Sequence, residues 1–351
     1  MDTPKWPRRP GDPVREMLAP RFYGSTPTLF GAPRARTPDD LGGADLAFLG
    51  IPWSAPPPDS RSPAASLNFI GTERTPSLFR TASMKYGGYL PELDVDVFER
   101  YRMVDYGDTD VVGDLAQTFD NVSSSVSEIL EAGACPVTMG GNSGPASYAV
   151  LRAIGARAQG PVAVLDLDAH HDNLRGEPED DPIDQPRWGG TWARRILTLP
   201  GVDPSQFHLF GLRGPRNDRE VFDRFTERGV DRAHIYTFRD IMRARRSGFE
   251  EWAEGIADDI VSRAAHVWIA VDADVFDMAA SPEFGDEPLG PSVAEVCWLG
   301  YLVGRAAGRE KLAGISFMAV PPDTVTTHWI CMYLMLYILA GTIHAETGER
   351  A

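Results

Sequence analysis

Residues 162–172 read VAVLDLDAHHD, and the prediction of the fold starts from this segment. Its first six residues, 162–167, form a nearly continuous apolar run, as expected for a strand covered on both faces. Asp168, His170 and Asp172 follow directly, and each carries a side chain able to bind a divalent cation. Because side chains alternate along a strand, Asp168 and His170 are expected to point to one side. The stretch therefore predicts a buried strand that ends at a metal site.

A second apolar run, residues 267–271, ends at another cluster of carboxylates, formed by Asp272, Asp274 and Asp277. Buried carboxylates are costly unless they are paired or bind a cation, so two such clusters favour a metal site over a structural role. A hard cation such as Mn²⁺ accepts carboxylates together with one imidazole. The predicted metal ligands are Asp168, His170, Asp172, Asp272 and Asp274.

Short apolar runs recur along the rest of the chain, with helical segments between them. This alternation predicts an α/β fold, a three-layer, doubly wound and mostly parallel eight-stranded sheet with ligands at the carboxyl ends of its strands. The other strands are expected at residues 44–53, 103–108, 136–139, 207–212, 234–238 and 312–317. Helices are expected at residues 118–132, 144–155, 191–199, 249–264, 292–307 and 326–344.

The composition bounds the organisation of the chain and its partners. Residues 1–41 are irregular and rich in Pro, Gly and Arg, so we expect an N-terminal arm that is disordered or packs on a neighbouring subunit, followed by one domain at 42–351. The net charge of −16 disfavours nucleic acid and favours a small cationic ligand.

The apolar run at 329–343 falls short of the about 20 residues of a membrane span, so we expect a buried helix and no membrane partner. Three scattered cysteines indicate reduced thiols in a cytoplasmic protein.

Two long loops, residues 54–74 and 175–187, fit either a mouth or lid of a binding site or variable surface insertions.

The order and spacing of the motifs resemble the ureohydrolase family of arginases and agmatinases, and the agmatinase branch most of all. The family's Gly-Gly-Asp-His-Ser, Asp-Ala-His-x-Asp and Ser-x-Asp-x-Asp-x-x-Asp-Pro segments correspond to residues 140–144, 168–172 and 270–278. Agmatinase-like pieces also occur at residues 48–52, 71–80 and 105–108. The resemblance covers residues 20–345 and implies the arginase/deacetylase-like sheet.

The resemblance implies a site for one or two ions of Mn²⁺, or of Ni²⁺ in some members, and a metal-activated hydroxide that attacks a guanidinium carbon and releases urea. One ion would be bound by Asp168, His170, Asp272 and Asp274, and the other by Asp168, Asp172 and Asp272. The resemblance also implies assembly as a trimer or hexamer and a small cationic guanidino-type substrate.

Further side chains are assigned to catalysis and to substrate binding. His171, Asp172 and Asp277 are the predicted catalytic residues. Trp188 and Trp192 are predicted to line an aromatic wall for a cation. Asn142 and Ser143 are also predicted to bind the substrate. Alternation along a strand favours the opposite interpretation of His171, pointing away from the site, and core packing is an equal alternative for both tryptophans.

Four segments depart from the family pattern. Ser143 and Asn142 stand where the family has a histidine ligand and an aspartate, and Gly189 stands where many members carry a histidine. Ala319 replaces the glutamate expected to hold the guanidinium, while Ala270 and Met278 replace a serine and a proline. The second ion would therefore lack its imidazole.

Three functions compete on these observations. The preferred one is a ureohydrolase-like, metal-dependent hydrolase, an agmatinase-like amidinohydrolase with an altered site. The second is a non-catalytic subunit that partners a complete paralogue, as in heteromeric enzymes of the metformin-hydrolase type. The third is a single-metal amide hydrolase, by analogy with deacetylases of the same sheet topology.

Overall fold

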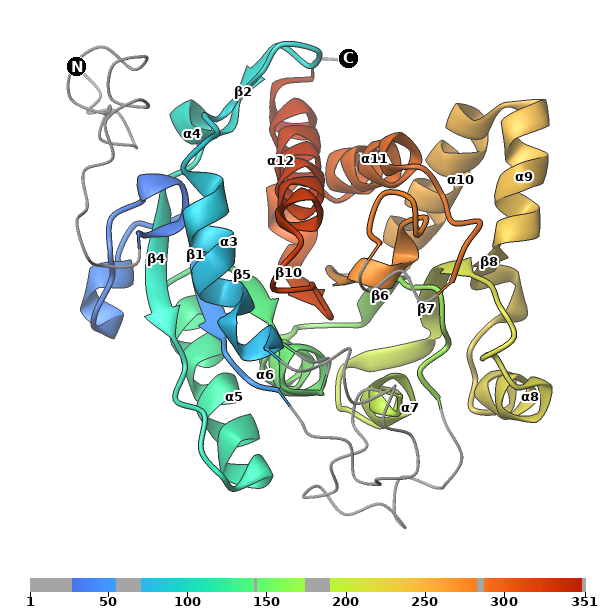
Figure 1. The fold of residues 1–351 in the computed structure, drawn as a ribbon, viewed down its shortest axis with the longest axis horizontal. Coiled ribbons are helices and arrows are strands. Elements are labelled where there is room, and N and C mark those ends of the chain that lie inside the picture. Colours follow the sequence, from blue (N-terminus) through green and yellow to red (C-terminus); the bar gives the residue numbers. More distant parts are fainter. Residues whose placement is uncertain (1–26, 55–70, 142–143, 174–189, 283–286, 349–351) are drawn as a thin grey trace.

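The computed structural model describes residues 27–54, 71–141, 144–173, 190–282 and 287–348 (Figure 1). Eight parallel strands form one sheet in the order β4-β1-β5-β10-β9-β6-β7-β8, which confirms the predicted α/β architecture. The strands are β1 (Leu46–Ile51), β4 (Met103–Asp108), β5 (Cys135–Gly140), β6 (Val162–Leu167), β7 (Val202–Leu212), β8 (Ile235–Thr237), β9 (His266–Asp272) and β10 (Leu312–Met318). A separate antiparallel pair joins β2 (Tyr89–Leu90) and β3 (Val95–Asp96).

Helices cover both faces of the sheet (Figure 1). One layer contains α3 (Thr75–Ser83), α9 (Phe238–Ser247), α10 (Phe249–Ser262), α11 (Val293–Lys311) and α12 (Val325–Thr347). The other contains α5 (Leu115–Glu131), α6 (Val150–Arg157), α7 (Trp192–Ile196) and α8 (Arg219–Glu227). Short helical elements are α4 (Val97–Arg100), η1 (Leu29–Gly31), η2 (Pro38–Leu41), η3 (Thr72–Arg74), the π-helical η4 (Pro145–Ala149), η6 (Arg232–His234) and η7 (Ala273–Val275).

The burial of β6 explains why residues 162–167 form a central strand. Val162 and Val164 pack into the core beneath α5, α6 and α7, whereas Ala163, Leu165 and Leu167 pack into the core beneath α10, α11 and α12. All six residues are buried, as the continuous apolar run predicts for a strand between two helical layers. The carboxyl end of β6 consequently delivers Asp168 to the middle of the sheet edge.

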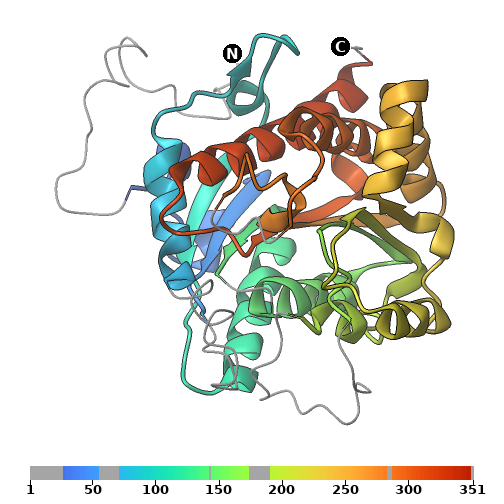
Figure 2. The ribbon, with the colours of Figure 1, turned by 45° about the vertical axis from the view of Figure 1, so that its right-hand side comes forward.

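Helices α11 and α12 lie against each other along the outer face (Figure 2). A Cβ atom added at Gly304 would lie 2.1 Å from the carbonyl oxygen of Ile338, and one added at Gly341 would lie 2.1 Å from that of Tyr301. Glycine at these positions therefore allows the two backbones to touch. Helix α12 is long and apolar enough to cross a membrane, but 78% of its most apolar window is buried inside this fold.

The agmatinase-like pieces at the sheet edge form a buried ion-pair network. The guanidinium of Arg80 binds Asp105 through Nε at 2.8 Å and Nη2 at 3.0 Å, and it binds Asp108 through Nη1 at 2.6 Å. Asp105 also accepts the backbone N–H of Leu29 at 2.8 Å. Residues 27–41, part of the expected N-terminal arm, thus pack on the core through Leu29 and Phe30, whereas residues 1–26 lie outside the described residues.

Candidate metal centre

The predicted ligands converge where two neighbouring strands end. Strands β6 and β9 are paired in register, Leu167 with Val271, so Asp168 and Asp272 emerge side by side. Asp168, His170 and Asp274 each offer a ligand atom within 4.8 Å of the others. Asp168, Asp172 and Asp272 form a second such group. The structure therefore brings all five predicted ligands together, in two groups that share Asp168.

Backbone amides hold the carboxylates of this centre in place. Asp168 accepts the N–H of His170 through Oδ1 at 2.6 Å, and Asp274 accepts the N–H of Ala169 through Oδ1 at 3.0 Å. Asp272 accepts the N–H of Asp274 at 3.0 Å. The second carboxyl oxygen of Asp168, Oδ2, is buried and has no hydrogen-bond partner within the described part of the chain. The centre thus keeps buried oxygen atoms available for a cation.

The electrostatics of the centre match this geometry. Burial, followed by the neighbouring carboxylates, raises the pKa of Asp168 and of Asp272 well above the ordinary range. Burial of its carboxyl group also raises the pKa of Asp172, to about 7. The pKa of Asp274 is lowered instead, because its contact with His170 (Nδ1 to Oδ2, 2.9 Å), together with hydrogen bonds to Ala169 and Asp168, outweighs the cost of burial. A divalent cation would neutralise this crowded negative charge, so the residues present fit such an ion.

Asp172 is held by Trp192. The backbone of Asp172 adopts a φ of +36°, a region that L-residues rarely occupy. The indole N–H of Trp192 donates to Asp172 Oδ2 at 2.7 Å. The Trp192 ring is fully buried and meets Trp268 edge to face at 6.1 Å. Of the two interpretations of Trp192, the structure therefore favours core packing: the ring lies in the core, and its N–H holds a predicted ligand.

Two predicted catalytic residues lie outside both ligand groups. His171 accepts the backbone N–H of Asn173 at Nδ1 (3.2 Å), and burial lowers its pKa to about 4. Asp277 accepts the backbone N–H groups of Ala279 and Gly290, each at 2.9 Å. These contacts tie local backbone together, and the catalytic roles stay predictions. Asn142, Ser143 and Trp188 lie outside the described residues.

Three further charged residues at the centre were not predicted from the sequence. Asp166 lies two residues before Asp168 on the same side of β6, and both of its buried carboxyl oxygens lack a partner among the described residues. Arg213 follows β7, and Glu287 lies in the loop before α11; both are buried. The alternation of side chains along the predicted strand could have identified Asp166, because residues two positions apart point to the same side. Glu287 offers no such pattern, because only the tertiary fold brings it to His170.

Ala319, which the sequence led us to expect in place of a guanidinium-binding glutamate, is buried. Ala319 follows β10 with a φ of +51°, and its N–H donates to the carbonyl of Gly141 at 2.9 Å. This contact joins the ends of β10 and β5 beside the centre. A methyl group at this point supplies no charge for binding a cation.

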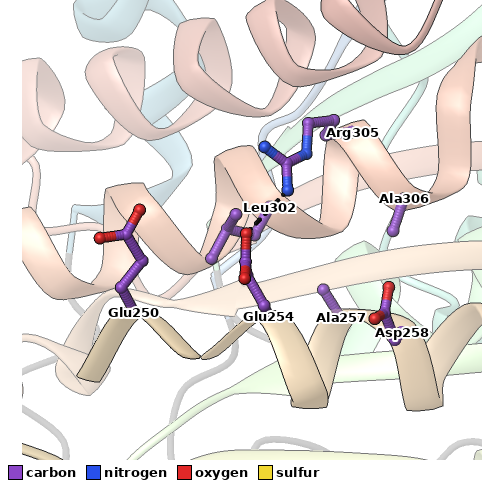
Figure 3. A pocket seen from close by; sticks show the side chains of 7 residues that line it. All are labelled: Glu250, Glu254, Ala257, Asp258, Leu302, Arg305 and Ala306. Carbon is purple, nitrogen blue, oxygen red and sulfur yellow. Dashed lines mark hydrogen bonds and ion pairs between the residues drawn. The ribbon is translucent and has the colours of Figure 1, made fainter. Parts of the chain in front are cut away.

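A pocket of about 430 Å³ lies between α10 and α11, away from the predicted metal ligands (Figure 3). Acidic side chains of α10 line it, and one of them, Glu254, pairs with Arg305 of α11 at 2.9 Å. Among the predicted site residues that the structure describes, none lines this pocket.

Comparison with known proteins gives one consistent result. A sequence model of the arginase family matches residues 44–340. The N(1)-aminopropylagmatine ureohydrolase of Thermococcus kodakarensis is 28% identical over 285 residues, 79% of this chain and 83% of the relative. The proclavaminate amidino hydrolase of Streptomyces clavuligerus superposes with a TM-score of 0.75 at 25% identity, over 93% of this chain and all of that one. A formiminoglutamase of Trypanosoma cruzi solved with Mn²⁺ superposes with a TM-score of 0.71 at 19% identity, over 90% and 98% of the two chains.

Proposed function

The chain belongs to the arginase family, and from that premise we propose that it is a metal-dependent hydrolase that cleaves a C–N bond of a guanidine-type substrate. The observation that carries the proposal is the convergence of four aspartates and one histidine in two groups sharing Asp168. Purely structural carboxylates would be paired with cationic side chains, whereas Asp168 Oδ2 is buried without a hydrogen-bond partner in the described chain.

We assign Mn²⁺, or alternatively Ni²⁺, to this centre. Asp168, His170 and Asp274 would hold one ion together with Asp272, and Asp168, Asp172 and Asp272 would hold a second. The oxygen-rich ligand set with one imidazole suits Mn²⁺, which the Trypanosoma cruzi neighbour contains. A bound divalent ion lowers the pKa of water and so supplies a nucleophile near neutral pH.

The chain's own residues would orient this chemistry and attract the substrate. Trp192 holds Asp172, and backbone amides hold Asp168 and Asp274, so the ligands are fixed before an ion arrives. The net charge of −16 attracts a small cation such as a guanidino compound. The relative named N(1)-aminopropylagmatine ureohydrolase supports an agmatinase-like amidinohydrolase. Asp172, His171 and Asp277 remain the proposed catalytic residues, with Asn142, Ser143 and Trp188 proposed to contact the substrate.

Urea release tests this proposal. Protein loaded with Mn²⁺ or with Ni²⁺ is incubated with a panel of guanidino compounds, and urea is measured. We expect turnover of at least one compound and its loss in Asp272→Ala. The control Glu254→Ala removes a carboxylate from the distant pocket and should leave turnover unchanged. Metal-loaded protein that releases no urea from any compound contradicts the enzymatic proposal.

A second candidate function, a non-catalytic subunit of a hetero-oligomer, is favoured by one observation: buried Ala319 replaces the family's guanidinium-binding glutamate. A complete paralogue would then supply catalysis. Purification from the native cell distinguishes the two, because a stoichiometric partner with an intact Asp-His motif supports the subunit role. One ion per chain together with hydrolysis of amides would instead support the single-metal amide hydrolase.

The oligomeric state and the cellular location of the chain are further proposals, which start from its membership of the arginase family. We propose a trimer or hexamer, with residues 1–41 as an N-terminal arm and residues 42–351 as the ureohydrolase-like domain. Reduced cysteines favour the cytoplasm, since Cys135, Cys297 and Cys331 are buried free thiols. Mass photometry of the full chain measures the proposed assembly.

A further inference from the structure

Both nitrogens of the His170 ring face carboxylates. Nδ1 lies 2.9 Å from Asp274 Oδ2, within the predicted ligand group. Nε2 lies 3.5 Å from Oε1 of Glu287, a residue 117 positions further along the chain. Glu287 is only 4% exposed, so its carboxylate has been brought out of water to reach this ring. Such burial calls for a compensating contact.

Arg213 fixes the backbone that carries Glu287. Its Nη2 donates to the carbonyl of Glu287 at 3.0 Å and to that of Asp274 at 2.8 Å, and its Nε donates to that of Pro288 at 3.1 Å. The same guanidinium binds the carbonyls of Gly211, Val275 and Phe276. One buried cation therefore fastens the Glu287 loop to the turn that carries Asp274.

Gly214 makes room for the Glu287 carboxylate. A Cβ atom added at Gly214 would lie 2.2 Å from both Cδ and Oε2 of Glu287, too close for any side chain. Gly214 also has a φ of +82°, which favours glycine. The hydrogen bonds of Arg213 to the backbone and the absence of a side chain at Gly214 together place one carboxylate, that of Glu287, beside the His170 ring.

We propose that Glu287 is a positioning residue of the metal centre, which accepts the Nε2–H of His170 and thereby directs the Nδ1 lone pair at the ion. The inference rests on the metal site proposed above. A neutral imidazole carries one N–H, so a carboxylate that binds Nε2–H selects the form in which Nδ1 is free to ligate. Carboxylates that bind the far nitrogen of a ligating histidine fix its ring and typically contribute about 10–100-fold in metal affinity.

Calorimetric titration with Mn²⁺ tests the inference in the full chain. We expect Glu287→Ala to weaken Mn²⁺ binding by about 10–100-fold. Glu287→Gln keeps an acceptor oxygen and the side-chain volume, so its affinity should lie between those of the wild type and Glu287→Ala. Glu295→Ala, which removes a carboxylate at the start of α11 without touching His170, should bind like the wild type.

The outcomes separate this inference from the proposed function. Wild-type affinity in both Glu287 variants overturns the positioning role while leaving the metal site intact. A wild-type chain that binds no Mn²⁺ overturns both. If Glu287→Ala fails to fold, Glu287→Gln decides the matter, because it fills the same space: weakened binding with an unchanged metal-free melting temperature supports the role, and unchanged binding overturns it.

Discussion

At the scale of single residues, Trp192 combines packing with positioning, because its ring lies in the core and its N–H binds Asp172. Trp192→Phe keeps an aromatic ring in the core but removes this donor and makes the buried side chain smaller. We predict about 10–100-fold weaker Mn²⁺ binding by titration calorimetry. The matched control is Trp268→Phe, which loses a donor to Ser316 (3.0 Å) away from the ligands. Equal affinities in the two variants would show that the Trp192 contact does not support the metal centre.

The five metal ligands were predictable from the sequence because each follows an apolar run, so local alternation and strand order bring them together. Glu287 was not predictable, since its partner His170 lies 117 positions away and its own neighbourhood shows no periodicity. Arg213 directly follows the predicted strand 207–212, but its contact with the carbonyl of Glu287 arises only in the tertiary fold. The sequence left the role of Trp192 open between a binding surface and the core, because an aromatic residue near a predicted site has the same local pattern in both.

At the scale of elements, the close approach of α11 and α12 depends on glycine. In Gly341→Ala the new methyl group would meet the carbonyl of Tyr301, so we predict a loss of about 1–3 kcal/mol in unfolding free energy. Urea denaturation measures the change. Gly255→Ala is the control, because Gly255 lies within α10 and a Cβ there meets nothing within 4 Å. It should be neutral or stabilising by up to about 1 kcal/mol. Unchanged stability of Gly341→Ala would contradict the packing argument.

The sequence predicted the central strands better than the peripheral elements. β4 and β6 have the expected bounds because their ends coincide with the ends of apolar runs. β7 begins at Val202 rather than Phe207, since its first four residues are only half-buried and show no apolar run. Helices α3, α8 and α9 were not predicted, because charged or polar residues dominate their sequences, and even the buried positions of α3 include Thr75, Arg80 and Ser83.

At the scale of the whole molecule, acid should weaken the fold through His208. This ring is fully buried and stacked on His234 at 4.0 Å, beside Tyr236 and near Arg263, while Asp259 contacts His234. Burial, then His234 and Arg263, lower the pKa of His208 to about 3. A lowered histidine pKa stabilises the fold above the ordinary value of about 6.5, and this contribution is lost as the pH falls from there toward 3.

Melting temperatures between about pH 4 and pH 7 test this expectation. As the pH falls, His208→Gln should lose less stability than the wild type because it lacks the buried imidazole, whereas the raised pKa values of Asp168, Asp172 and Asp272 act in the opposite direction in both proteins. His266→Gln, which alters a histidine that is not fully buried, is the control and should follow the wild-type slope. Parallel curves for wild type and His208→Gln would assign the acid sensitivity to other groups.

Asp168 belongs to both groups of proposed metal ligands at the ends of β6 and β9. Elemental analysis of protein loaded with Mn²⁺ and then desalted tests this shared role. We predict one or two ions per wild-type chain, fewer or none in Asp172→Ala, which disrupts one group, and none in Asp168→Ala, which disrupts both. An Asp168→Ala protein that is folded and retains the wild-type metal content would contradict the account.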